Sequence, residues 1–340
     1  MRSLEPGISI KVSSLPGRHP FHVRLVQAGP ESIEQAGQAL RSGGVIAFPT
    51  ETVYGLGALA FDPVAVARIF EIKRRPHFDP LIVHVLDRQM LGRVVAEVPH
   101  VAERLIERFW PGPLTLVLRK QAEVPEIVTA GLPSVAVRMP SHEFARSLLK
   151  EVGAPLAAPS ANPFGGLSPT RAEHVAAGLG ERVDLIVDGG PSEHGLESTI
   201  VALEPEAVLL RPGAIQVEAI EEVIGRLTRV RGGPAQAPGG FPHHYSPRTP
   251  LRVIDPRLVP AHERRLAGAI ALREGFEGYA AVRILSRGGD LREAAARFFE
   301  ALHHLDSLGL ERIDAQPLPE NGLGLAMMDR LARAAASRNS

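Results

Sequence analysis

The sequence predicts a mixed α/β fold arranged as two globular domains. From about residue 23 to 228, short β-branched runs alternate with amphipathic helical patterns, as in sheets covered by helices. The chain has 340 residues, of which 44% are hydrophobic, and this is enough to build two cores. Residues 229–250 hold too much glycine and proline for a regular element. We therefore expect a first domain at 23–228, a linker at 229–250 and a smaller α/β domain at 251–340.

Capping residues place the helices of the first domain. One helix is expected to begin at Pro30 and to end at the glycine pair 43–44. A second begins after Asp62, whose carboxylate is a typical cap, and ends with basic residues. Thr170 and Glu173 have the spacing of a capping box, which predicts the start of another helix.

Strands are expected where short apolar runs lie between turn residues. In the first domain these runs are Val45–Phe48, Leu81–Val85, Leu114–Leu118, Ser134–Arg138, Leu156–Ala158, Leu185–Asp188 and Thr199–Val201. In the second domain we expect strands at Leu251–Ile254 and Tyr279–Leu285, and helices through Leu266 and Ile270, around 290–306 and near 323–336. Prolines and glycines interrupt residues 1–22, which are predicted to be a loose extension.

Composition excludes several classes of protein. Lys plus Arg and Asp plus Glu number 38 each, so net charge gives no general attraction to nucleic acid or to an anionic membrane. The absence of cysteine excludes disulfides, a cysteine nucleophile and cysteine-bound metal clusters, and it suits a reducing cytoplasm. No apolar run reaches roughly 18 residues, and the N-terminus lacks the apolar core of a signal peptide. We expect a soluble, cytoplasmic protein.

Basic residues at three places favour an anionic substrate. Lys73–Arg75 precede a proline at the end of a helix, where cations commonly offset the helix dipole. The same three cations would also form a compact clamp for a polyphosphate. Arg138 and Arg211 each stand where a strand ends beside a proline, and strand ends are where ligands collect in α/β sheets. Together these positions make anion binding the better interpretation.

Two further segments contain groups that could bind a small polar ligand. Residues 48–58 read FPTETVYGLGA, a strand that runs into a loop with hydroxyls and glycines; taken alone, it is typical of a strand-to-turn transition with positive φ. Residues 157–163 combine small side chains with a hydroxyl and an amide. His84 alternates with apolar neighbours, which on its own is typical of a structural histidine. Dinucleotide, P-loop, nucleophile-elbow and paired-histidine metal motifs are all absent.

Seven motifs occur in one order: FPTETVYGLGA, KRRPHFDPLIVHV, SVAVRMP, APSANPFGGLSPT, GLESTIV, LLRPG and HYSP. In these motifs the chain resembles the threonylcarbamoyl-AMP synthases of the YrdC superfamily, in their longer two-domain, Sua-type form. The resemblance is dense over roughly residues 25–250 and covers the remainder only in pattern. It implies a twisted mixed α/β sheet with helices around it and a positively charged concave face.

The resemblance also implies the site residues. Threonine would bind Thr52, His84, Arg138, the backbone around Ala158, and Ser198. The nucleotide would bind Lys73, Arg75, Asp79, Ser134, Ser160, Ser168, Arg211 and Tyr245. At Asp79 the chain departs from many relatives, which have an asparagine there. A carboxylate near phosphates would repel them unless it binds a magnesium-bound water or a ribose hydroxyl.

The implied reaction condenses L-threonine, bicarbonate and ATP into threonylcarbamoyl-adenylate and pyrophosphate, for modification of tRNA. No enzyme nucleophile is needed, and Lys73 and Arg75 would stabilise the developing charge. Mg²⁺ is expected to be held by phosphates and water, without ligands from protein side chains. The implied partner is a tRNA threonylcarbamoyltransferase that receives the adenylate, and direct binding of tRNA is left open.

The linker is expected to act as an active-site lid. An inert tether would not need the histidines and Tyr245 that residues 232–248 contain, and glycines on either side could serve as hinges. The alternative is an ordinary flexible spacer.

Two alternative functions remain. One is a carbamoyltransferase related to hydrogenase-maturation proteins, whose cysteine-rich zinc fingers this chain cannot form. The other is an RNA-binding module, against which stand the zero net charge and the lack of an aromatic platform.

Overall fold

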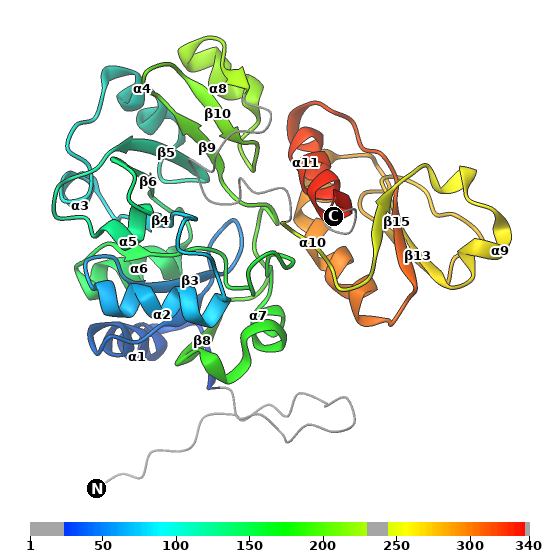
Figure 1. Ribbon diagram of the computed structural model, residues 1–340, viewed down its shortest axis with the longest axis horizontal. Helices are drawn as coiled ribbons and strands as arrows, with labels where there is room; N and C mark the ends of the chain where they lie inside the picture. The colour runs from blue at the N-terminus through cyan, green and yellow to red at the C-terminus, as the bar shows by residue number, and fades with distance from the viewer. Residues whose placement is uncertain (1–23, 230–243, 337–340) are drawn as a thin grey trace, which may run out of the picture.

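The computed structural model describes residues 24–229 and 244–336, which form two α/β domains side by side (Figure 1). The predicted extension 1–22 and most of the predicted linker, residues 230–243, lie outside the described residues. Among the helices that are described, none is both long and apolar enough to span a bilayer.

An eleven-stranded mixed sheet forms the first domain. Its strands lie in the order β1-β8-β2-β3-β7-β4-β6-β5-β9-β10-β11. Their bounds are β1 Leu25–Gln27, β2 Ile46–Phe48, β3 Gly55–Leu59, β4 Ile82–His84, β5 Leu114–Arg119, β6 Ser134–Arg138, β7 Leu156–Ala157, β8 Leu185–Asp188, β9 Thr199–Ala202, β10 Val208–Arg211 and β11 Thr228–Arg229. Every strand run predicted in this domain is confirmed to within a residue at each end. The short β1 and β11 at the sheet edges, and β3, were not predicted. For β10 only its end at Arg211 was expected, and the strand does end there.

Eight α-helices surround this sheet (Figure 1). They are α1 Pro30–Arg41, α2 Pro63–Lys73, α3 Arg88–Gly92, α4 His100–Phe109, α5 Glu126–Thr129, α6 Glu143–Val152, α7 Ala172–Leu179 and α8 Val217–Ile224, with a 3₁₀ turn at Gly180–Arg182. Asp62 caps α2 as predicted, because its carboxylate accepts the N–H groups of Val64 and Ala65, both at 3.0 Å. The predicted capping box is wrong: α7 begins one residue after Arg171, and Thr170 instead lies 3.4 Å from Nδ1 of His174.

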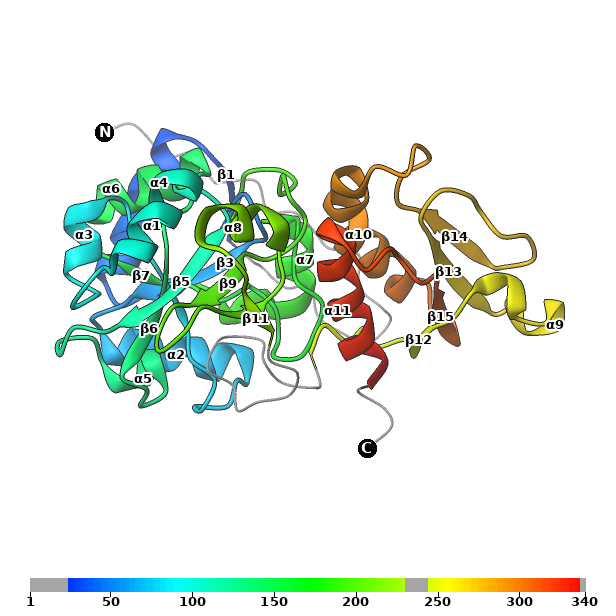
Figure 2. The same ribbon diagram turned by 90° about the horizontal axis from the view of Figure 1, so that it is seen from above.

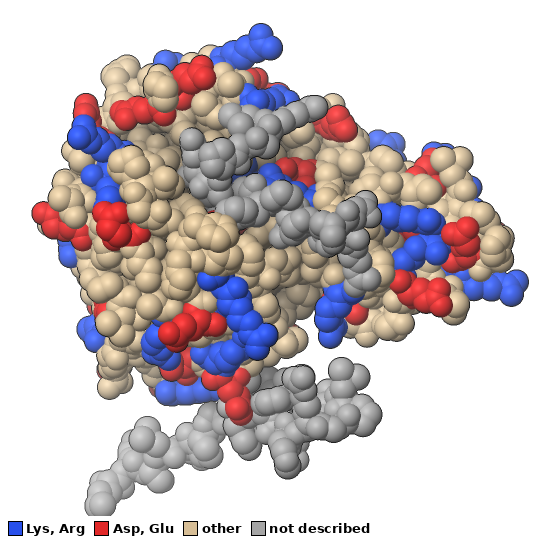
Figure 3. Space-filling view, viewed as in Figure 1, with Lys and Arg blue, Asp and Glu red and all other residues tan. Residues whose placement is uncertain are grey.

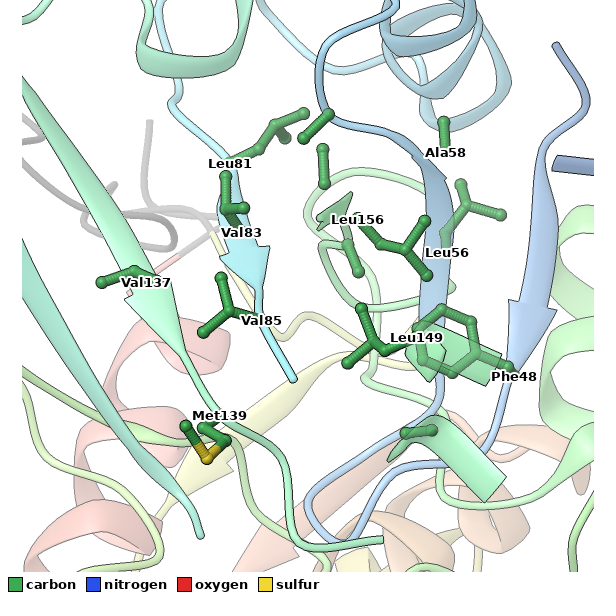
Figure 4. Packing of buried hydrophobic residues seen from close by; sticks show 14 of the residues in the cluster. Phe48, Leu56, Ala58, Leu81, Val83, Val85, Val137, Met139, Leu149 and Leu156 are labelled. Carbon is green, nitrogen blue, oxygen red and sulfur yellow. The ribbon is translucent and has the colours of Figure 1, made fainter. Parts of the chain in front are cut away.

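The core of the first domain lies between these strands and the helices that cover them. Figure 4 shows its centre, formed by Phe48, Leu56, Ala58, Leu81, Val83, Val85, Val137, Met139, Leu149 and Leu156. Burying one such aliphatic or aromatic side chain stabilises the fold by roughly 1.5–3 kcal/mol. Because alternate residues of β4 face this core, His84 points to the opposite face, as its alternation predicts.

Glycines in the segment that follows β2 serve a different purpose from the one expected. Gly55 and Gly57 belong to strand β3 and do not have positive φ. A Cβ at position 57 would lie 2.6 Å from the ring of Phe48, which is too close for a real contact. Gly57 therefore allows β3 to pair with β2 beneath an aromatic ring.

The second domain is a four-stranded parallel sheet in the order β12-β15-β13-β14. Its elements are β12 Leu251–Val253, a 3₁₀ turn at Pro256–Leu258, α9 Ala261–Arg264, β13 Ala267–Ala271, β14 Ala281–Ile284, α10 Leu291–Ser307, β15 Arg312–Ala315 and α11 Gly322–Ala336. The helix predicted through Leu266 and Ile270 is wrong, since β13 occupies that place. All five residues of β13 are buried. A strand buried on both faces has no alternation, so its alanine-rich run resembled a helix.

Helices α10 and α11 lie between the second sheet and the first domain, as both views show (Figure 2). Here the imidazoles of His174, from α7, and His303, from α10, stack with centroids 3.8 Å apart. Nε2 of His303 lies 3.0 Å from the carbonyl oxygen of Ser168. Burial is the main cause that lowers the pKa of His174, to about 3, and that of His303. Both rings are therefore neutral where the domains meet.

Acid is expected to weaken this contact. The unfolded chain binds a proton at each of these histidines below about pH 6.5. In the folded chain the pKa of His174 is about 3 and that of His303 is also lowered, so the free energy of unfolding falls as the pH drops below about 6.5. The slope is on the order of 1.4 kcal/mol per pH unit for each such histidine. Urea unfolding between pH 7 and 5 measures it. The variant His174→Phe keeps a stacked ring that cannot titrate, and its slope should be smaller; an unchanged slope would contradict this account.

Candidate functional site

One pocket collects most of the predicted site residues at the ends of the central strands. Strands β4 and β6 are parallel neighbours, and their pairing sets His84 directly beside Arg138. The pocket is lined by Thr50, Thr52, Val53, Tyr54, Gly55, Arg75, Ile82, His84, Arg138, Ala158, Pro159, Ser160, Glu197, Ser198, Arg211, His244 and Tyr245. It therefore has three guanidinium groups and one carboxylate on its wall. An anionic ligand suits such a wall, as the basic strand ends predicted.

Arg138 and Thr52 form one side of the pocket. Nη1 of Arg138 donates to Oγ1 of Thr52 at 2.9 Å, and its other terminal nitrogen lies 3.5 Å from the carboxylate of Glu51. Oγ1 of Thr52 also lies 2.9 Å from Oγ1 of Thr50. All four side chains are buried. The guanidinium is thus fixed at the end of β6, where it can meet a carboxylate of a ligand.

His84 is a neutral imidazole beside this guanidinium. Burial, and then the charge of Arg138, lower the pKa of His84 well below its ordinary value. Its ring meets Phe48 edge to face, with centroids 6.3 Å apart. Within the described residues, Nδ1 of His84 has no hydrogen-bond partner. A ligand that enters the pocket can therefore use this nitrogen.

Ser198 and Arg211 are joined across strands β9 and β10. Nε and Nη2 of Arg211 donate to the carbonyl oxygen of Ser198 at 3.1 and 2.9 Å, and Nη2 also lies 3.1 Å from Oγ of Ser198. That hydroxyl lies 2.7 Å from Oγ1 of Thr115. Because these partners are fixed in the sheet, the guanidinium has a defined orientation on the pocket wall.

The basic run at the end of α2 divides into two parts. Arg74 adopts the left-handed conformation with φ of 54° and is exposed, so the predicted clamp of three cations is wrong. Lys73 and Arg75 are both buried. Nζ of Lys73 donates to the carbonyl oxygens of Ser160 and Asn162 at 2.5 and 2.6 Å. Burial lowers the pKa of Lys73 well below its ordinary value.

Arg75 pairs with Asp79 at the pocket wall. Nη2 of Arg75 lies 2.8 Å from the carboxylate of Asp79, and further bonds run to the carbonyl oxygens of Asp79 and Pro80 at 3.1 and 2.7 Å. Asp79 is fully buried behind Arg75 and does not line the pocket. Its carboxylate is therefore placed to orient the guanidinium, while the guanidinium faces the cavity.

Nine of the predicted site residues line the pocket, and four do not. Lys73 and Asp79 lie behind it, as described above. Ser168 is buried, and its hydroxyl donates to the carboxylate of Glu197. Ser134 begins β6 and Arg138 ends it, so the two lie roughly 13 Å apart along the strand. The pocket thus includes the whole predicted threonine set and four members of the predicted nucleotide set.

Sequence reasoning missed the roles of Glu197 and His244. Both are buried on the pocket wall. Burial raises the pKa of Glu197, but the guanidinium groups of Arg330 and Arg211 and the hydroxyl of Ser168 lower it, and the net pKa is below its ordinary value. The available signal was a charged residue at position 197, two positions before the buried strand β9. Burial, followed by the charge of Arg75, lowers the pKa of His244 well below its ordinary value.

Charged side chains also gather in the second domain, where Arg283, Arg287, Arg297 and Glu293 line a separate pocket. On the face drawn in Figure 3, acidic and basic side chains are interspersed. Within the described ranges, no three His, Asp or Glu side chains gather closely enough to hold a metal ion.

Comparisons with known proteins agree along nearly the full chain. A family model for the Sua5, YciO and YrdC proteins, described as "Telomere recombination", matches residues 38–213. A second, described as the C-terminal domain of threonylcarbamoyl-AMP synthase, matches residues 215–336.

Similar proteins share both domains. The threonylcarbamoyl-AMP synthase of Pyrococcus abyssi is 44% identical over 88% of this chain and 92% of its own length. That of Bacillus subtilis is 43% identical over 90% of this chain and 93% of its own. A crystal structure of Pyrococcus abyssi Sua5 complexed with L-threonine superposes with a TM-score of 0.85 at 40% identity, and covers 93% of this chain and 98% of that one. The chain belongs to the threonylcarbamoyl-AMP synthase family, in its long two-domain form.

Proposed function

We propose that the pocket condenses L-threonine, bicarbonate and ATP into threonylcarbamoyl-adenylate and pyrophosphate. The observation that carries this proposal is the buried wall on which Arg75, Arg138 and Arg211 lie with a neutral His84 and paired hydroxyls. Such a wall suits two anionic ligands, an amino-acid carboxylate and a polyphosphate. Family membership identifies which reaction joins them.

The reaction proceeds without a covalent bond to the enzyme. The amine of threonine adds to carbon dioxide, which bicarbonate supplies with loss of water, and gives a carbamate. An oxygen of the carbamate attacks the α-phosphorus of ATP, and the bond to the β-phosphate oxygen breaks to release pyrophosphate. Transfers of this kind depend mainly on orientation and on charge placed where it develops. The described pocket supplies both.

We assign the threonine side of the pocket to Thr52, His84, Arg138, the backbone at Ala158, and Ser198. Arg138 would bind the carboxylate in a forked contact, which a fixed guanidinium favours. The neutral His84 would accept or donate one hydrogen bond to the ligand. The nucleotide side comprises Arg75, Ser160, Arg211 and Tyr245, with Lys73 behind them stabilising charge through the loop that it anchors.

In this proposal, two of the other predicted nucleotide residues act by orienting side chains on the pocket wall. Asp79 orients Arg75, and Ser168 orients Glu197. Ser134 lies at the far end of β6 and reaches the nucleotide only if the nucleotide extends along that strand.

Mg²⁺ would be held by the phosphates and water. Glu197, the carboxylate on the pocket wall, is already bonded to Arg330 and Ser168, so the wall offers no free carboxylate as a ligand. The ion would offset the charge of the phosphates.

The adenylate is reactive and would pass to a tRNA threonylcarbamoyltransferase. ATP and tRNA meet in the cytoplasm, and we propose the same location for the enzyme. The interspersed surface charge in Figure 3 favours an enzyme over an RNA-binding module. The absence of cysteine disfavours a carbamoyltransferase built on zinc fingers.

Pyrophosphate release tests the proposal directly. Release from ATP should require both threonine and bicarbonate, and serine should be a poorer substrate, with kcat/KM lower by on the order of tenfold. The reason is that one methyl group in a fitted pocket contributes on the order of 1–3 kcal/mol. Release without threonine, or equal efficiency with serine, would contradict the substrate assignment.

Arg211→Ala is expected to raise KM for ATP by at least tenfold. Loss of one charged hydrogen-bond partner typically costs on the order of 1.5–3 kcal/mol. Steady-state kinetics with varied ATP measure the effect. Arg74→Gln is the matched control, because it removes an exposed cation outside the pocket. Similar kinetics for the two variants would place the nucleotide elsewhere.

A lid role for residues 232–248 rests on the part that is described. His244 and Tyr245 line the pocket, and within the described residues the hydroxyl of Tyr245 has no hydrogen-bond partner. We propose that this hydroxyl binds the nucleotide and that the segment excludes water from the adenylate.

Tyr245→Phe and Tyr245→Ala separate these two contributions. The first should raise KM for ATP a few-fold, because it removes one hydrogen bond. The second should also lower the yield of adenylate per ATP consumed, because water gains access. A coupled assay of pyrophosphate against adenylate measures both quantities. Wild-type values in both variants would reduce the segment to a spacer.

A further inference from the structure

Arg330 brings a charge from the second domain to the back of the pocket. It lies on α11, and its side chain is fully buried. Nε and Nη2 donate to Oε2 of Glu197 at 3.1 and 2.9 Å, a forked contact between the two domains. Nη1 donates to the carbonyl oxygen of Pro212 at 2.5 Å. The chain therefore satisfies this guanidinium mainly with groups of the first domain.

The same guanidinium also supports Tyr245. Its central carbon lies 5.1 Å from the centroid of the Tyr245 ring, a distance at which a cation is attracted to an aromatic face. Tyr245 has a positive φ of 64°, which is unfavourable for a tyrosine. Packing around the ring must therefore hold it in place, and Arg330 is one of its immediate neighbours.

Glu197 carries the effect of Arg330 into the pocket. One carboxylate oxygen meets Arg330, and the other accepts the hydroxyl of Ser168. The next residue along the chain, Ser198, binds Arg211 through its carbonyl oxygen and its hydroxyl. Without Arg330, an uncompensated carboxylate would remain on the wall of an anion-binding pocket. It would repel a phosphate and compete with it for the nearby guanidinium groups.

We propose that Arg330 is a positioning residue for the nucleotide side of the pocket, because it neutralises Glu197 and holds the ring of Tyr245. The second domain thereby completes the site of the first. This inference rests on the proposed placement of the nucleotide beside Arg211 and Tyr245. The competing interpretation is that the ion pair of Arg330 with Glu197 links the two domains and affects stability alone.

Removal and rescue of charge separate the two interpretations. Arg330→Met should raise KM for ATP at least tenfold. It should change KM for threonine much less, because Arg138, which would bind the threonine carboxylate, is held by Thr52 and Glu51. Adding Glu197→Gln in the same chain removes the uncompensated charge and should recover at least threefold of the loss. If Arg330 only links the two domains, the double variant lacks both charged partners, and its KM for ATP should be no lower than that of Arg330→Met.

Arg252→Met is the control for the second domain. Arg252 pairs with the buried Asp314 at 2.6 Å, and neither residue lines the pocket. This variant should lose stability but keep the KM for ATP of the wild type. If Arg330→Met behaves as Arg252→Met does, the inference is overturned.

Arg330→Lys keeps the test decisive if Arg330→Met does not fold. A lysine preserves the neutralising charge but loses the forked contact and the flat stack on the ring. Its KM for ATP should rise a few-fold, and wild-type kinetics would overturn the positioning role. Pyrophosphate release by the wild-type chain is measured first. Its absence would reject the proposed function, whereas the inference fails only when the wild type is active and the variants do not differ.

Discussion

Four cationic side chains of the site are buried, and the need to give each of them hydrogen-bond partners is the constraint on which the rest of this structure depends. Lys73, Arg75, Arg138 and Arg211 are each no more than 6% exposed, and burial of an unpaired charge is very unfavourable. Carbonyl oxygens and hydroxyls accept most of the hydrogen bonds from these four side chains, and few carboxylates do so. Carbonyl oxygens satisfy N–H donors without cancelling their charge, whereas Asp79 and Glu51 offset part of the charge of Arg75 and Arg138.

Strand order explains how the charges meet. Parallel pairing of β4 with β6 places His84 beside Arg138, and antiparallel pairing of β9 with β10 brings Ser198 to Arg211. The end of α2 reaches the same edge through a left-handed turn at Arg74. Segments that are distant in the sequence thus contribute side chains to one pocket, and the sheet fixes their spacing more firmly than any loop could.

Local sequence patterns predicted the elements that are determined by interactions between residues close together in the sequence. The cap at Asp62 and the strand Ser134–Arg138 follow from residue type and alternation, and both are confirmed. Strand β13 could not be found in this way, because burial on both faces removes the alternation. The contact of Glu197 with Arg330 spans 133 positions, and nothing near either residue indicates its partner. The motif order predicted the pocket members, but not which side chains face the cavity and which support those that do.

The backbone at Tyr245 has an energetic consequence for substitutions at this position. Its left-handed conformation costs roughly 1–2 kcal/mol for a residue with a Cβ, and the ring contacts of His244, Phe299 and Arg330 offset that cost. Removal of the ring would leave this cost in place without the contacts that offset it. Glycine is the residue that would remove the backbone cost together with the ring, because it has no Cβ.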